Sequence, residues 1–143
     1  LNRAVAVANV NGPQAGIEAV EAIQNGSQLE SYYLLYAVLG EFEKQLNNFQ
    51  AAIDNFRKAL ELTDDWRGRV ENAWRRAGWR ALLNDTDGAL EELERAFDNR
   101  RFNAINLGVD PVYDRIRVQP RFRKLLVSLG LDGWFPAGDG HDR

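Results

Sequence analysis

The chain has 143 residues and a mass of 16.2 kDa, which is the size of one ordinary domain. Its content of 45% hydrophobic and 27% charged residues is that of an average soluble globular protein. Without cysteine, and with His141 as its one histidine, the sequence argues against disulfides, thiolate chemistry and imidazole catalysis. It has no apolar run of about 20 residues and no signal-peptide pattern, so we expect a cytoplasmic protein without a membrane partner.

The net charge of −3 is unevenly distributed. Residues 1–66 carry 4 basic and 9 acidic groups, which is a net charge of −5, whereas residues 67–143 carry 14 and 12, which is a net charge of +2. Neither half is strongly basic. This balance argues against nucleic-acid binding by the surface as a whole.

The first 27 residues predict a pair of short helices. Apolar residues recur at helical spacing in residues 4–8 and again in residues 17–23, and the Asn-Gly-Pro sequence at 11–13 has turn composition. We expect Asn-Gly-Ser at 25–27 to end this first pair.

Residues 31–64 predict a second helix pair. Apolar residues three and four apart run from Tyr32 to Phe42, and the pattern resumes from Phe49 to Leu60. Asn47 lies in the turn between them, where asparagine tolerates the left-handed conformation that glycine would supply. Small residues stand where the two helices should cross: Gly40, Ala52 and Ala59.

Residues 68–99 predict a third pair, with helices at 70–81 and 89–97. The turn between them matches part of the spacing of a calcium loop, but Leu83 stands where the first oxygen ligand belongs. Asp85 or Asp87 as the N-cap of the return helix explains the same residues. We therefore predict no metal site.

The segment 103–131 predicts a C-terminal cap. We expect extended chain through 107–111, a turn around Asp114 and a last helix that begins near Pro120 and stops at Gly130. Residues 132–143 read as a Gly-rich tail.

The 34-residue unit that begins at Tyr33 resembles a tetratricopeptide (TPR) repeat. Seven residues fall on signature positions of that repeat: Tyr36, Leu39, Gly40, Phe49, Ala52, Phe56 and Ala59. The resemblance implies an all-α, TPR-like solenoid of three helix pairs plus a C-terminal capping helix. The repeats would be about 1–27, 31–64 and 68–99, in a single domain over residues 1–131.

Two segments resemble more particular groups of bacterial proteins. Residues 1–62, with the runs LNRAVAVA, GPQAG and YYLL, resemble the C-terminal TPR-like extension of extracytoplasmic-function sigma factors. Residues 105–131, with VDPVYDRIRVQPRFRKLLVSLGL, resemble the cap that ends many bacterial TPR arrays. The first resemblance implies a regulatory tail, whereas the second implies architecture and says little of function.

In repeats of this class the inner helices line a concave groove, and projecting their groove positions onto this sequence gives a candidate partner-binding site. Its residues are Leu34, Ala37, Glu41, Lys44, Gln45, Glu71 and Trp74. Arginines interleaved with tryptophans form a candidate basic contact patch nearby, because both residue types are favoured at recognition hot spots. Its residues are Arg67, Arg75, Arg76 and Arg80. The alternatives are that Trp74 packs in the core while the arginines pair with nearby acids, or that the patch contacts nucleic acid, which the charge balance disfavours.

These patterns favour a non-catalytic protein–protein interaction module that needs no cofactor and binds a partner peptide or helix in the groove. The alternative is a regulatory C-terminal tail of a sigma-factor-like transcription regulator. An enzyme based on carboxylates is a remote alternative. Paired acids such as Glu91 and Glu94 lie on early helical turns, where acidic side chains stabilise the helix, so a structural role explains them without catalysis. Self-association through the N-terminal helix is a further expectation, since Leu1, Val5 and Val7 would form an apolar face.

Overall fold

The computed structural model describes residues 1–23, 28–99, 107–131 and 133, and all regular structure within these ranges is helical. The all-α prediction is therefore confirmed. The turn predicted at 25–27, the start of the cap at 103–106, and the tail apart from residue 133 lie outside the described residues. The helices are α1 (Asn2–Asn11), α2 (Pro13–Glu21), α3 (Tyr33–Gln45), α4 (Phe49–Leu62), α5 (Trp66–Glu71), α6 (Ala73–Leu82), α7 (Thr86–Asp98), the 3-10 helix η3 (Pro111–Tyr113) and α8 (Pro120–Ser128).

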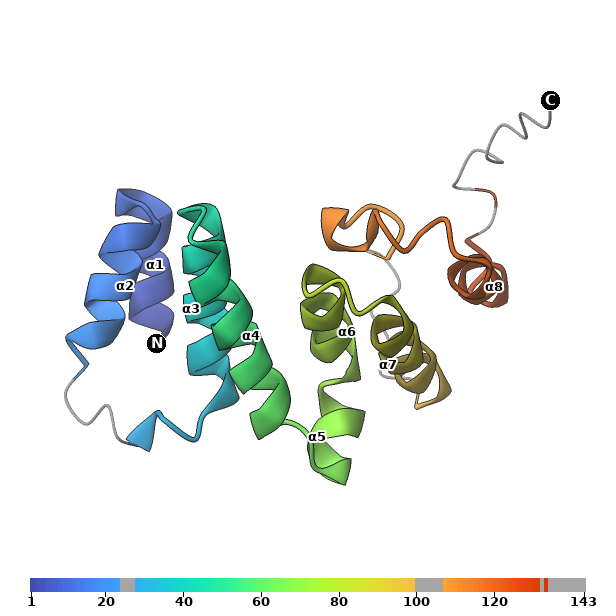
Figure 1. Cartoon of the computed structure of the whole chain (residues 1–143), viewed down its shortest axis with the longest axis horizontal. Helices are drawn as coiled ribbons and strands as arrows, with labels where there is room; N and C mark the ends of the chain where they lie inside the picture. The colour runs from blue at the N-terminus through green and yellow to red at the C-terminus, as the bar shows by residue number, and fades with distance from the viewer. Residues whose placement is uncertain (24–27, 100–106, 132, 134–143) are drawn as a thin grey trace. The chain divides into compact units, whose positions relative to one another are not determined.

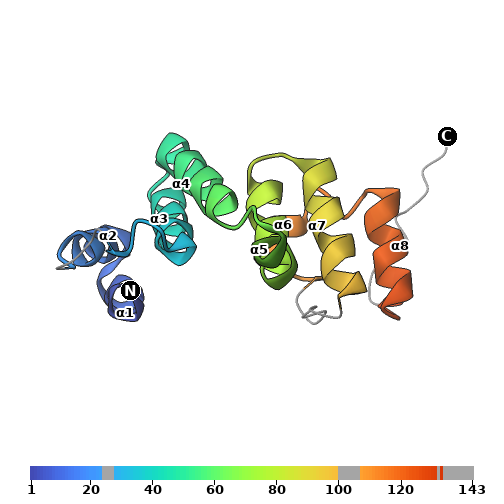
Figure 2. The ribbon, with the colours of Figure 1, turned by 90° about the horizontal axis from the view of Figure 1, so that it is seen from below.

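Helices that follow one another in sequence pack as hairpins. Figure 1 and Figure 2 show α1 beside α2, α3 beside α4 and α6 beside α7. By its contacts the chain divides into an N-terminal unit, Leu1–Gly68, and a C-terminal unit, Arg69–Arg143. The three predicted helix pairs are thus present, two in the N-terminal unit and one in the C-terminal unit.

The core of the N-terminal unit joins its first three helices. Its buried residues are Ala4, Ile17, Val20, Leu35 and Phe42. Close approach of α3 and α4 depends on Gly40, where an added Cβ would lie 2.8 Å from a ring carbon of Phe56. Ala52 and Ala59 are buried on α4, so the small residues predicted at the helix crossing are confirmed there.

The core of the C-terminal unit is continuous from α6 to α8. Its buried residues are Ala77, Ala81, Ala89, Leu90, Leu93, Leu107, Tyr113, Ile116, Phe122, Leu125 and Leu126. Tyr113 returns to α6, where its ring centroid lies 5.4 Å from that of Trp74 and its hydroxyl donates to the Trp74 carbonyl at 3.5 Å. Burial and the charge of Asp110 raise the pKa of the Tyr113 phenol above its ordinary range, so this donor keeps its proton.

Helices α3, α6 and α8 share one type of C-terminus. Each is followed by a residue with positive φ: Asn47 at 62°, Asn84 at 60° and Gly130 at 69°. In each case the next residue's N–H donates to the carbonyl five residues earlier, as in a Schellman motif. The predictions that Asn47 supplies the left-handed turn and that Gly130 ends the last helix are confirmed.

Two local predictions are wrong, and one residue of a predicted apolar pattern is exposed. The third pair does not begin as one helix near Val70, because α5 precedes α6 and the two are separated at Asn72. The segment at 107–111 is not extended: it turns into η3, where the Asp110 carboxylate accepts from the Val112 N–H at 3.0 Å. Phe49 is 60% exposed, since it is the first residue of α4 and lies beyond the end of α3.

Candidate functional site

The groove residues predicted from sequence divide between the two units. Five lie on α3 in the N-terminal unit, while Glu71 ends α5 and Trp74 lies in α6, both in the C-terminal unit.

The α3 residues form one face of that helix. They occur at positions i, i+3, i+7, i+10 and i+11 counted from Leu34, which is the spacing of one helical stripe. Leu34, Ala37, Glu41 and Lys44 are partly exposed and Gln45 is exposed. We call this stripe the α3 face.

Glu41 organises the polar end of the α3 face. Its carboxylate lies 2.8 Å from the ammonium group of Lys44 and accepts a hydrogen bond from the Gln45 amide at 3.3 Å. Both charged side chains are more than a third exposed, so solvent screens this pair and its contribution to stability is small. The α3 face is therefore apolar at Leu34 and Ala37, and has an opposite-charge pair within reach of a partner at its other end.

Trp74 contributes to the core of the C-terminal unit. Its ring is partly buried and packs against Tyr113. This agrees with the alternative that Trp74 packs in the core. Glu71 is exposed. Contact of either residue with a partner stays a prediction.

The predicted basic patch is corrected at Arg76, which lies inside the C-terminal unit. It is fully buried, and its Nε donates to the Glu92 Oε1 at 2.9 Å. The partly exposed Arg80 is held by Asp85 at 2.5 Å, while Arg67 and Arg75 are exposed. Arg76 is thus unavailable to a partner, because it forms a buried ion pair between α6 and α7.

The turn before α7 has the capping role that its sequence predicts. The Asp85 carboxylate accepts a hydrogen bond from the Gly88 N–H at 3.0 Å and is the N-cap of α7. Within the described ranges, no three histidine, cysteine, aspartate or glutamate side chains are grouped so that they could hold a metal ion. None of the described helices is both long and apolar enough to cross a membrane.

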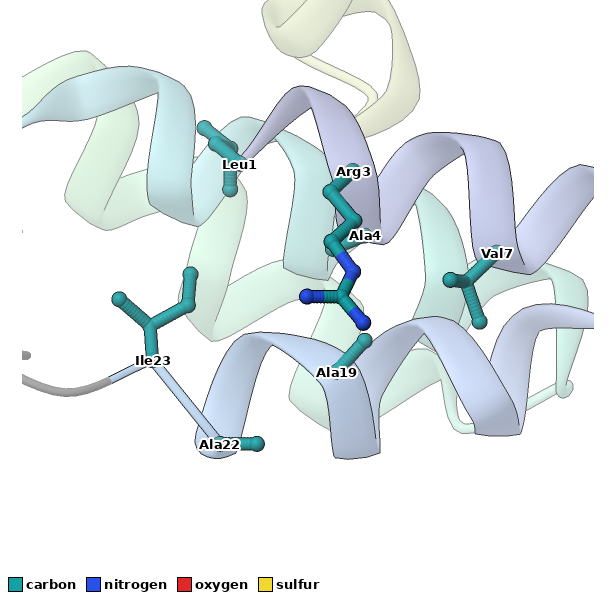
Figure 3. Close-up of a pocket in the computed structure, with 7 residues that line it drawn as sticks. All are labelled: Leu1, Arg3, Ala4, Val7, Ala19, Ala22 and Ile23. Atoms are coloured by element: carbon teal, nitrogen blue, oxygen red, sulfur yellow. The ribbon is translucent and has the colours of Figure 1, made fainter.

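Sequence reasoning missed a groove between α1 and α2. It has a volume of about 240 Å³ and lies wholly within the first hairpin (Figure 3). It is lined by Leu1, Arg3, Ala4, Val7, Ala19, Ala22 and Ile23. The signal in the sequence is the pair Ala19 and Ala22, because small side chains three residues apart leave one side of the helix shallow.

A second groove, of about 270 Å³, lies between α7 and α8. Arg121 of α8 crosses it to Glu94 of α7, and its Nε and Nη2 donate to the two carboxylate oxygens at 3.0 and 2.8 Å. The Arg121 hydrogen bonds lower the pKa of Glu94 below its ordinary value, which partial burial opposes and the charges of Arg121 and Lys124 reinforce.

We predict that the Glu94–Arg121 pair contributes stability at neutral pH and loses it in acid. Because folding lowers the pKa of Glu94, the contribution is present above the unfolded pKa and disappears as the pH falls through the folded one. A carbon-detected NMR titration of the Glu94 carboxyl should give a midpoint below its ordinary 4.5, and Arg121→Gln should move that midpoint upward. An unchanged midpoint in Arg121→Gln would contradict the assignment.

Comparison of the chain with protein-family models, with curated proteins and with solved structures gave no match.

Proposed function

We propose that this chain is a TPR-like, non-catalytic protein-interaction module that acts in the cytoplasm and binds a helix or extended peptide of a partner. The observation that carries the proposal is the α3 face, where the predicted groove positions of that helix form one partly exposed stripe. The hairpin order of the helices and the seven TPR signature residues support the same class.

The α3 face suggests how a peptide would be recognised. An apolar side chain of the peptide packs on Leu34 and Ala37, since burial of that area supplies most of the binding free energy. The exposed Glu41–Lys44 pair offers one acceptor and one donor to polar groups of the peptide, which fixes its direction along α3.

The test uses a displayed library of random peptides selected against the full chain, followed by titration of a fluorescein-labelled enriched peptide. We expect Leu34→Ala and Lys44→Glu each to weaken binding about tenfold, which is about 1.4 kcal/mol. Arg57→Glu on α4 is the matched control, because it reverses an exposed charge in the same unit away from the α3 face. Failure to enrich any peptide, or equal binding by all variants, would contradict the proposal.

A second candidate is the regulatory tail of a sigma-factor-like transcription regulator, as the resemblance of residues 1–62 implies. The partial exposure of Leu1 and Val7 beside the α1–α2 groove favours it, since an apolar face there can receive another domain. The two candidates are distinguished by position: a partner of this second kind would be lost on Val7→Asp and retained on Lys44→Glu.

A further inference from the structure

The α1–α2 groove combines an apolar floor with a charged side chain. Ala4 and Val7 line it from α1 and Ala19 lines it from α2, together with Leu1 just before α1 and Ala22 just after α2. Val10, also on α1, is 82% exposed.

Arg3 is the one cationic side chain among the described residues that line the groove. Figure 3 shows its side chain extending from α1 toward Ala19 of α2. Among the described residues, no carboxylate lies within ion-pair distance of Arg3, which is exposed. A guanidinium over an apolar floor favours an occupant that brings a carboxylate with its own apolar surface.

An acid follows the same helical stripe as a groove-lining residue. Glu18 is exposed on α2 and lies one helical turn before Ala22, so the two residues fall on the same side of the helix. Among the described residues, Glu18 accepts one hydrogen bond, at 3.3 Å from the exposed amide of Gln14. The face of the first hairpin is therefore self-complementary: Arg3 of α1 supplies a cation, Glu18 of α2 supplies an anion, and the other groove-lining side chains are apolar.

We propose that two copies of this chain associate through their α1–α2 grooves, with Arg3 of each copy paired with Glu18 of the other. A two-fold axis that runs along the groove lays α1 of each copy over α2 of the other, which is the arrangement of an isologous dimer. That operation forms two Arg3–Glu18 pairs and brings together the apolar floors. Unlike the peptide proposal, this one involves neither Leu34 nor Lys44.

The test is sedimentation equilibrium of the full 143-residue chain over a concentration series. We expect a reversible monomer–dimer equilibrium. Arg3→Glu and Glu18→Arg should each raise the dimer dissociation constant roughly a hundredfold, because each variant places like charges opposite one another at two symmetric contacts.

Mixing the two variants tests whether Arg3 and Glu18 pair directly across the dimer. A dimer of one Arg3→Glu chain with one Glu18→Arg chain has opposite charges at both contacts, so the equimolar mixture should recover wild-type association. Matched controls are Arg57→Glu on α4 and Glu21→Arg, which lies on the side of α2 away from Ala19; both should dimerise like wild type. Circular dichroism checks that each variant is folded.

Two results would overturn the proposal. One is a monomer at every concentration, which would leave the groove to a different protein or to none. The other is a dimer that Arg3→Glu and Glu18→Arg leave unchanged, which would place the contact elsewhere on the chain.

Discussion

Replacing Glu92 by glutamine is expected to destabilise the C-terminal unit by about 3 kcal/mol, although the substitution barely changes the volume of the side chain. The Glu92 carboxylate is the negative centre of a buried network: Arg76 Nε lies 2.9 Å from one oxygen, and Arg95 lies 2.7 Å from the other. The side chains of Arg76 and Glu92 are only 1% and 3% exposed. Removing the negative charge leaves a buried guanidinium without its compensating carboxylate. Loss of one partner of a buried ion pair lowers the free energy of unfolding far more than replacement of both partners.

Chemical denaturation followed by tryptophan fluorescence measures this effect, since Trp79 is buried in the same unit. The matched control is Glu91→Gln, an exposed position one residue earlier on α7, where we expect a change within about 0.5 kcal/mol. Equal stability of the two variants would show that Glu92 carries no buried charge.

The double variant Arg76→Met with Glu92→Leu separates the charge from the packing. It removes both buried charges together, and Arg80 and Arg95 are exposed enough to turn toward water. We expect it to recover to within about 1 kcal/mol of the wild type, since apolar replacements of buried ion pairs are often neutral. Stability as low as that of Glu92→Gln would instead indicate that the network is needed for packing.

Truncating Phe122 to alanine is expected to cost about 3 to 5 kcal/mol. The ring is fully buried in the C-terminal core, and its centroid lies 6.2 Å from that of Tyr113. The loss combines the transfer free energy of the ring with a cavity that neighbouring helices fill only in part.

Val127→Ala is the control for Phe122→Ala because it lies on the same helix and is 60% exposed. We expect it to change the free energy of unfolding by less than about 0.5 kcal/mol. Thermal melting followed by circular dichroism compares the two variants. Similar melting curves for both would mean that α8 does not depend on its buried face.

Features that depend on neighbouring residues could be predicted from the sequence. The three helix pairs follow from apolar periodicity, and the ends of α3 and α8 follow from Asn47 and Gly130, whose backbone freedom is a local property. The N-cap at Asp85 is equally local. By contrast, α5 is six residues long with no buried residue, so it has no apolar face to detect.

The candidate sites depend on longer-range contacts and were harder to predict. The sequence places Arg76 in a contact patch because arginines interleave there with tryptophans, yet it follows Ala73 by three residues on the buried side of α6. An arginine there and a glutamate beside buried Leu93 on the next helix together indicate a buried ion pair. The spacing of the α3 face could be predicted because it lies on one helix, whereas the α1–α2 groove depends on how two helices pack.

The return of Tyr113 to α6 has a kinetic consequence. In the N-terminal unit most contacts between helices join successive helices. In the C-terminal unit the Tyr113 hydroxyl meets the Trp74 carbonyl across 39 positions of sequence. Since loop-closure entropy and contact order both rise with this separation, the N-terminal unit should reach its native state first and the C-terminal unit should set the slowest refolding rate.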